Sequence, residues 1–345
     1  MRFFLSGILA GWAAAGSLAA PAASSHPGAL AWPAGWPVYD HVVVVIEENK
    51  DYDRIVGNPQ APYLNQVLRR EGANLTRMFA EEHVSEGNYF WLFSGSNQGV
   101  GFQDQVPGEV FAAPSLGGQL RAAGRSFRGY AEDLPAVGST VAGAGHYARK
   151  HVPYISFADV PGGSDPAVSG NLRFADFPAP GGYPALPTVA FVVPNLINDM
   201  HDCPGPGGED CVARGDAWLR ANLDPYYQWA KTHNSLLVLT FDENDDPVGY
   251  RGLTDPAMDP AALGPGADPA LVRFRKAAQN RIATLLAGAH VKPGDYPEGK
   301  GVTHVNLLRT LEAMYGLGRA GAQQPRAAAW GISDDALLTD VFRHR

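Results

Sequence analysis

The sequence predicts an α/β protein with a mostly parallel central sheet and helices on both faces of that sheet. Three runs are apolar without alternation once past their first residue, as strands buried on both faces are, and they lie at 41–46, 188–193 and 235–240, the last ending in Thr240. Segments with helical spacing separate the three runs. Alternation of buried strands with helices is typical of a parallel sheet covered on both faces.

The helices are recognised by apolar residues at helical spacing and by the glycines that end them. Segment 61–71 stops before Gly72, and the aromatic segment 88–93 ends near Gly95. Further helices are expected at 116–123, 216–232 and 305–315, the last of them amphipathic. A strand around Phe127 and a fourth strand that begins the segment 281–291 complete the pattern.

The N-terminal residues 1–23 have the features of a signal peptide. Arg2 supplies a positive start, an apolar stretch follows, and small residues suited to cleavage come next. An uncleaved anchor is the alternative, but the stretch is short and interrupted by glycines. Residues 24–38, rich in Pro, Ala, Gly and Ser, indicate a linker, and residues 39–345 a single domain. We therefore expect an exported protein, periplasmic or secreted, without stable membrane insertion.

The composition argues against several classes of protein. A hydrophobic fraction of 45% is ordinary for a globular protein, so disorder is not expected. A formal net charge of −8 argues against a nucleic-acid-binding surface, which needs a basic stripe. In an exported chain, Cys203 and Cys211 favour one disulfide over two free thiols, and its short ring would stiffen the segment after His201. The sequence does not indicate an oligomeric state.

Polar residues follow the three buried runs at the point where each strand ends. They are Glu48 and Asn49 after the first run, Asp199 and His201 after the second, and Asp242, Glu243 and Asp245 after the third. The carboxyl ends of parallel strands meet at one edge of a sheet, so these groups become neighbours. Converging carboxylates repel one another unless a cation neutralises them, and oxygen and imidazole ligands suit Mg²⁺, Ca²⁺, Mn²⁺ or Zn²⁺. Taken singly, each cluster is explained as well by turn and helix-cap chemistry; together they favour a metal site.

Ser85 directly precedes the aromatic helix, within the segment 82–89. Free N–H groups at a helix N-terminus make a serine in this position suitable for binding or attacking an anion. A helix cap is the alternative, and the residues taken alone favour the cap.

Short blocks spread along the chain form a more specific pattern. Residues 46–53 read Ile-Glu-Glu-Asn-Lys-Asp-Tyr-Asp, and residues 83–89 read His-Val-Ser-Glu-Gly-Asn-Tyr. Further blocks lie at 147–154, 194–202, 240–245, 290–294 and 303–308. In this order the blocks resemble the bacterial and fungal acid phosphatase and phospholipase C family, which belongs to the alkaline phosphatase superfamily. The resemblance implies an alkaline-phosphatase-like fold.

The resemblance also implies roles for individual residues. The expected ligands of a divalent metal cation are Glu48, Asn49, Asp242 and Glu243, and the expected nucleophile is Ser85. Asn88 is expected to donate to a phosphoryl oxygen, and His201 and His304 to contact phosphate or to protonate the leaving oxygen. Further candidates are Asp199, which would orient His201 or bind a second metal ion, His83, Lys150 and Asp245.

The chain departs from the pattern of that family at three places. Gly87 and Val84 stand where the family commonly has proline, which loosens the turn but leaves Ser85 and Asn88 in place. The Pro- and Gly-rich stretch 246–272 is longer than usual and follows the third acidic cluster. These departures leave the substrate preference open and not the type of reaction.

The expected function is metal-dependent hydrolysis of small phosphate esters, as in an acid phosphatase, through a phosphoserine intermediate. A phospholipase C or another phosphodiesterase is the alternative enzyme, because the core chemistry is shared. No basic amphipathic helix of the kind that binds membrane surfaces is evident in the sequence, which favours soluble monoesters. A non-catalytic, metal-stabilised binding protein is the alternative of another class, and an intact Ser85 with four candidate ligands argues against it.

Overall fold

The three apolar runs predicted as buried strands lie side by side at the centre of the sheet. β1 (His41–Glu47) pairs in parallel with β8 (Val189–Val193) on one side and with β9 (Ser235–Phe241) on the other. Only His41 among their residues is not fully buried. The expected position of these strands is therefore confirmed. The structure is a computed structural model that describes residues 28–345 apart from 101–103, 105–106, 204–209, 246–262, 270 and 272–278.

The sheet is mostly parallel, as predicted. Within the described residues it has eight strands in the order β12-β2-β11-β9-β1-β8-β4-β7. The other members are β2 (Ala73–Leu75), β4 (Phe127–Ala131), β7 (Asn171–Arg173), β11 (Thr284–Gly288) and β12 (Gly294–Tyr296). β11 runs antiparallel to β9 and β2, and the remaining pairs are parallel.

The segment 281–291, predicted to begin with a fourth strand, holds two strands that belong to different sheets. β10 (Arg281–Ile282) pairs with β3 (Met78–Phe79), which also pairs with β13 (Val302–Thr303), and β11 then joins the main sheet. A separate hairpin consists of β5 (Gly143–Ala144) and β6 (Tyr147–Ala148).

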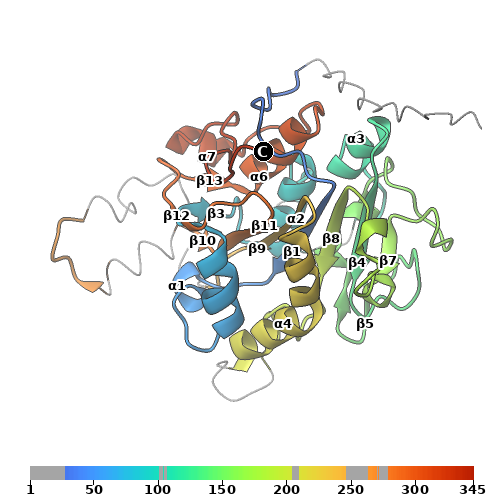
Figure 1. Cartoon of the computed structure of the whole chain (residues 1–345). Helices are drawn as coiled ribbons and strands as arrows, with labels where there is room; N and C mark the ends of the chain where they lie inside the picture. The colour runs from blue at the N-terminus through green and yellow to red at the C-terminus, as the bar shows by residue number, and fades with distance from the viewer. Residues whose placement is uncertain are drawn as a thin grey trace, which may run out of the picture.

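Helices cover both faces of the sheet (Figure 1). One face carries α2 (Ser85–Ser94), α3 (Leu116–Ala122) and α6 (His304–Met314), and the other carries α4 (Asp210–Ala230) and the π-helical turn η1 (Leu64–Arg69). Shorter elements are α1 (Tyr52–Ile55), α7 (Pro325–Trp330) and the 3₁₀ turns η2 (Arg149–His151), η3 (Pro153–Ser156), η4 (Phe174–Asp176) and η5 (Tyr183–Ala185). Phe93 of α2 packs on Phe127 and Phe191 of the sheet. Within the described residues no helix is long and apolar enough to cross a membrane.

The described part of the expected linker lies against the C-terminal residues. The ring of Trp32 meets the edge of Phe342 at 6.0 Å between centroids, and Trp36 contacts His344. The backbone N–H of Arg345 donates to the carbonyl of Gly35 at 2.9 Å. Residues 28–38 are thus attached to the body of the protein and do not form a free connector. The expected signal peptide lies outside the described residues.

Helix α6, expected to be amphipathic, is covered on its polar side as well as on its apolar side. All of its 11 residues are buried, because α2 packs on one side and the C-terminal residues cover the other. Arg309 and Glu312 lie inside the protein and are paired with each other at 2.7 Å. The polar side of α6 is therefore a packed surface too, covered by the C-terminal residues.

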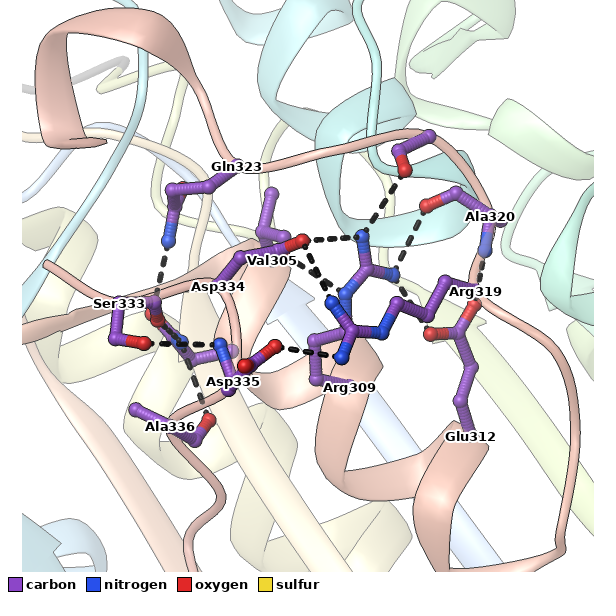
Figure 2. Close-up of polar contacts among 12 residues, drawn as sticks. Val305, Arg309, Glu312, Arg319, Ala320, Gln323, Ser333, Asp334, Asp335 and Ala336 are labelled. Atoms are coloured by element: carbon purple, nitrogen blue, oxygen red, sulfur yellow. Dashed lines mark hydrogen bonds and ion pairs between the residues drawn. The ribbon is translucent and has the colours of Figure 1, made fainter. Parts of the chain in front are cut away.

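Figure 2 shows how Arg309 is satisfied within that surface. Its Nε donates to Asp334 at 2.9 Å, and its terminal nitrogens donate to Glu312 and to the carbonyls of Ala320 and Gly321. Every donor group of the guanidinium faces an acceptor, which is the condition for burying a charged side chain. The C-terminal residues are thereby fixed to α6.

Removing this guanidinium should strongly destabilise the fold. Arg309→Ala leaves Glu312 buried without its partner, and breaking such a buried pair costs about 3–5 kcal/mol. Arg319→Ala is the matched control, because Arg319 contacts the same Asp334 at 3.6 Å but is about one-third exposed; its loss should cost less than about 1 kcal/mol. Urea unfolding of both variants measures the two losses. Equal losses would contradict the assigned difference between the two arginines.

Candidate active site

The register of β1 with β9 brings two acidic turns together at the carboxyl edge of the sheet. Glu47 lies opposite Phe241, so Glu48 and Asn49 meet the residues that follow β9. The backbone N–H of Asn49 donates to Asp242 Oδ1 at 3.0 Å. Asn49 has a φ of 49°, in the left-handed region that asparagine tolerates better than most residues.

The side-chain amide of Asn49 lies against the other three expected metal ligands. One terminal atom of the Asn49 amide lies 3.2 Å from Glu48 Oε2, 3.2 Å from Asp242 Oδ1 and 3.3 Å from Glu243 Oε1. With the amide oxygen in this position, three carboxylates surround it, and carboxylate and amide oxygens are the ligands that a hard cation takes. With the amide turned by 180°, the NH₂ group donates to the three carboxylates. The residues present therefore fit a divalent cation.

The electrostatics of this cluster also fit a cation. Burial raises the pKa of Glu48 well above its usual value, and the nearby Asp242 raises it further. Burial likewise raises the pKa of Asp242, and burial followed by Asp242 raises the pKa of Glu243. Ionised carboxylates packed this closely need a positive charge beside them.

Ser85 lies beside the same cluster and does not cap the helix. It is the first residue of α2, whereas the N-cap position belongs to Val84, which makes no side-chain capping bond. Ser85 Oγ donates to Glu48 Oε2 at 3.1 Å, and the hydroxyl of Tyr89 donates to Glu48 Oε1. The serine hydroxyl is therefore held between a carboxylate and the N-terminal end of a helix.

His151 belongs to this site and was missed by the sequence analysis. It lies in η2, is 1% exposed, and its ring stacks on Tyr89 at 5.2 Å. Its Nε2 lies 3.4 Å from Glu48 Oε1. Burial lowers the pKa of His151 well below its usual value. Only its place in the block 147–154, next to the candidate Lys150, pointed to it in the sequence.

His201 lies next to His151, with 5.7 Å between ring centroids. Potential ligand atoms of Glu48, His151 and His201 lie within 4.8 Å of one another, the one such group among the described residues. His201 is oriented by Asp202, whose Oδ1 lies 2.8 Å from Nδ1. Asp199, expected in that role, instead accepts from the backbone N–H of His201 at 2.8 Å and lies 3.5 Å from His151 Nδ1.

The other candidates surround the cluster at greater distance. Lys150 Nζ donates to Asp104 Oδ2 at 2.8 Å, and Asp104 Oδ1 accepts from the backbone N–H of Glu86 at 3.1 Å. His83 Nδ1 lies 3.6 Å from Glu243 Oε2. Asp245 is half-buried, and its charge raises the pKa of Lys50 against the larger, lowering effect of burial.

Asn88 and His304 were expected to contact phosphate, but both are bonded to the protein in this structure. Asn88 Oδ1 accepts from the backbone N–H groups of Glu81 and Glu82, at 3.1 and 2.9 Å, and its Nδ2 donates to the carbonyl of Glu82 at 2.7 Å. The two ring nitrogens of His304 bond Glu81 and the carbonyl of Phe241. Both side chains hold the segment before Ser85.

Gly87 is explained by its neighbour Glu82. A Cβ atom at position 87 would overlap Glu82 Oε2. The carboxylate of Glu82 is in turn held by Asn97, whose Nδ2 donates to Oε1 at 2.6 Å. The missing proline thus leaves space that an acidic side chain fills, so the turn is not loosened as the sequence suggested.

The expected disulfide is present. Cys203 and Cys211 are bonded, with 5.2 Å between their Cα atoms. The bond joins the segment just after His201 to the first turn of α4. Most of the stretch 246–272, expected to shape the rim, lies outside the described residues.

Comparison with known proteins identifies the family. A family model described as the phosphoesterase family matches residues 58–318. The chain belongs to the phosphoesterase family. It is 43% identical over 285 residues to a protein named phosphatidylinositol-3-phosphatase from Mycobacterium tuberculosis, a match that covers 83% of this chain and 80% of that protein.

More distant relatives agree with this assignment. The chain is 31% identical over 218 residues to the phosphate-repressible acid phosphatase of Penicillium chrysogenum, which covers 60% of this chain and 48% of the fungal protein. This member of the phosphoesterase family thus spans about half the length of that fungal enzyme. An alkaline phosphatase superfamily protein from Vibrio parahaemolyticus has the same fold, with a TM-score of 0.53, 10% identity and 83% and 71% of the two chains covered. The protein is a phosphoric ester hydrolase with an alkaline-phosphatase-like fold.

The contact between Gly87 and Glu82 predicts that Gly87→Ala changes the free energy of unfolding in opposite directions in the native chain and in a Glu82→Ala variant. Gly87→Ala in the native chain should lower the free energy of unfolding by about 1–3 kcal/mol, because the new methyl group displaces the Glu82 carboxylate. In a Glu82→Ala background the same change should raise it by up to about 1 kcal/mol, because alanine favours a helix over glycine.

A double-mutant cycle with urea unfolding measures the coupling between the two positions. Gly87→Ala with the same effect in both backgrounds would show that the two residues do not compete for space.

Proposed function

We propose that this phosphoesterase is a metal-dependent phosphomonoesterase that acts through a phosphoserine intermediate on Ser85. The observation that carries the proposal is the hydrogen bond from Ser85 Oγ to Glu48, a carboxylate that lies beside the Asn49 amide together with Asp242 and Glu243. A hydroxyl that faces carboxylates at a helix start is suited to attack on phosphorus and not to capping.

The proposed ligands of the cation are Asn49 and the three carboxylates around its amide, Glu48, Asp242 and Glu243. When bound, a divalent cation lowers the pKa of a neighbouring hydroxyl and stabilises negative charge on phosphoryl oxygens. The oxygen-rich ligand set suits Mg²⁺, Ca²⁺ or Mn²⁺, and the adjacent imidazoles also allow Zn²⁺.

The protein's own groups then perform each proposed step. Glu48 accepts the proton of Ser85 through the hydrogen bond already present. The oxygen of Ser85 attacks phosphorus, the bond to the ester oxygen breaks, and phosphoserine remains on the protein. Water then attacks phosphorus from the side that the ester oxygen has left, and its proton passes to the group that protonated that oxygen. Glu48 returns its proton to Ser85, and phosphate is released.

His201 is the proposed general acid for the leaving oxygen. It is the more accessible of the two neighbouring imidazoles, with a side chain 27% exposed, and Asp202 holds its ring. His151, fully buried beneath it, is proposed to donate to a phosphoryl oxygen. Lys150 is the proposed contact for the charge of the substrate near the solvent, and Asp104 restrains it.

The proposed substrate is a phosphate monoester, with the 3-phosphate of phosphatidylinositol 3-phosphate as a specific candidate. Support comes from the relative that is 43% identical and whose name states this activity, and from the fungal acid phosphatase. A phosphodiesterase is the second candidate, because both reactions need the same nucleophile and cation.

Three substrates distinguish these possibilities for the purified protein. They are 4-nitrophenyl phosphate, bis(4-nitrophenyl) phosphate and vesicles that contain phosphatidylinositol 3-phosphate. Hydrolysis of the monoester alone, or of the monoester and the lipid, supports the proposal. Preference for the diester replaces it with a phosphodiesterase. If the protein hydrolyses none of the three substrates, the result favours a non-catalytic, metal-stabilised binding protein.

Export is also proposed. Disulfides persist in oxidising compartments, and the Cys203–Cys211 bond is therefore consistent with a periplasmic or secreted protein. The apolar N-terminal sequence supports the same location.

Loss of one metal ligand should abolish both cation binding and activity. In Asp242→Ala the most central carboxylate is missing, so the purified variant should retain no stoichiometric divalent cation and should be inactive. Elemental analysis measures the metal, and 4-nitrophenyl phosphate the activity. Asp202→Ala, whose carboxylate lies outside the cluster, is the control for metal content. Full activity of an exhaustively chelated wild type, shown to be metal-free, would refute metal dependence.

Ser85→Ala should lower turnover by several orders of magnitude, because water would have to replace a positioned nucleophile. The variant should remain folded, since one lost hydrogen bond costs about 1 kcal/mol. Two successive inversions predict net retention with a substrate that is chiral at phosphorus. Near-native turnover of the variant, or net inversion, would mean that water attacks directly.

A further inference from the structure

Two buried side chains, His304 and Asn280, connect the segment before Ser85 to the turn after β9. Each of them bonds both pieces of chain, although the two pieces lie far apart in the sequence. Both side chains are at most 1% exposed. Their contacts therefore act between the proposed nucleophile and the proposed metal ligands.

His304, the first residue of α6, makes one connection through its ring. Nδ1 lies 2.6 Å from Glu81 Oε2, and Nε2 lies 2.8 Å from the carbonyl oxygen of Phe241. A carbonyl oxygen only accepts, and an ionised carboxylate only accepts, so both ring nitrogens carry hydrogen. The other oxygen of Glu81 accepts from the backbone N–H of Val305 at 2.9 Å. The imidazole is therefore fully engaged inside the protein.

Asn280 makes the second connection through its amide. Nδ2 donates to the carbonyl of Glu82 at 2.6 Å, and Oδ1 accepts from the backbone N–H of Asn244 at 2.8 Å. Its own carbonyl accepts from Ala80 at 3.0 Å. Asn280 has a φ of 58°, a left-handed conformation in which asparagine is among the residues most often found.

These hydrogen bonds lie next to the proposed metal ligands on one segment and next to the proposed nucleophile on the other. At the end of β9 and in the turn after it they fall at residues 241 and 244, on either side of Asp242 and Glu243. On the other side they fall at residues 81 and 82, just before Ser85. We propose that His304 and Asn280 form a clamp that sets the separation between the nucleophile and the metal ligands, so that both are positioning residues. The proposal rests on the proposed function.

The physical need for a clamp follows from the charges. The carboxylates of Asp242 and Glu243 repel each other, and their repulsion tends to displace the turn after β9 on which both lie. Hydrogen bonds from outside the cluster resist that movement and orient the ligands, as outer-shell groups do at metal sites. A displacement of about 1 Å at a reacting centre can lower the rate about 100-fold, so the separation matters for catalysis.

The test compares His304→Ala and Asn280→Asp with the wild type. Asn280→Asp keeps the shape of the side chain, but it loses the donor to Glu82 and places a carboxylate against a carbonyl. Thr310→Val is the matched control, because Thr310 is a buried residue of α6 whose hydroxyl bonds only Asn306 and Leu338 among the described residues. Circular dichroism establishes that each protein is folded at the assay temperature.

Two quantities are measured for each folded protein. The first is the dissociation constant of the divalent cation that restores the chelated wild type, obtained by competition with a chelating indicator. The second is kcat/KM for 4-nitrophenyl phosphate, which has a good leaving group, and for glycerol phosphate, which has a poor one. The clamp predicts that His304→Ala and Asn280→Asp weaken cation binding about 10–100-fold. They should lower kcat/KM by the same factor for both esters, and Thr310→Val should change neither quantity.

The outcomes separate the clamp from other roles. A loss in His304→Ala that is much larger for glycerol phosphate would make His304 a general acid and overturn the clamp, because only the poor leaving group needs a proton. Wild-type cation affinity and kcat/KM in the folded variants would also overturn it, and if His304→Ala does not fold, Asn280→Asp decides. A wild type that binds no cation and hydrolyses neither ester refutes the proposed function itself, and the clamp with it.

Discussion

Parallel pairing of β1 with β9, with Glu47 opposite Phe241, forces two acidic turns to the same point at the edge of the sheet. Both strands are buried on both faces, so neither can slip without exposing apolar residues and burying polar ones. The register therefore determines that Glu48 and Asn49 face Asp242 and Glu243. The chemistry of the site begins with this packing requirement of the core.

Several neighbouring groups interact with the carboxylates at this edge of the sheet. The backbone N–H of Asn49 donates to Asp242, and the backbone N–H of His201 donates to Asp199. The ring of His151 lies against Glu48. Side chains that were expected to bind phosphate, Asn88 and His304, are used to hold the loop before Ser85. In this structure much of the polar content of the site serves to maintain its shape.

Sequence reasoning was reliable where a local pattern determined the structure. The three buried strands could be read from apolar runs without alternation, and their ends located Glu48, Asp199 and Asp242 by the geometry of parallel sheets. The role of α6 could not be read in this way, because Arg309 and Glu312 look like solvent-facing residues until the C-terminal segment packs over them. A polar residue in a helical pattern does not show whether another segment will cover it.

Contacts between residues far apart in the sequence could not be predicted either. Glu81 meets His304 across 223 positions and Glu82 meets Asn280 across 198, and no local signal marks either pair. His151 was missed because it lies in a 3₁₀ turn and not after a buried strand. Gly87 was read as a loss of rigidity, since the side chain of Glu82 that fills the space cannot be placed from sequence.

The disulfide between Cys203 and Cys211 has a consequence for how this edge of the protein can change over generations. It closes a ring whose two ends are fixed, one beside His201 and the other in the first turn of α4. The cost of closing a loop rises only slowly with its length, so residues added to the ring raise that cost little. Insertions within the ring can therefore accumulate while His201 keeps its position. The disulfide thus allows the sequence of the ring to diverge while the position of the adjacent His201 is kept.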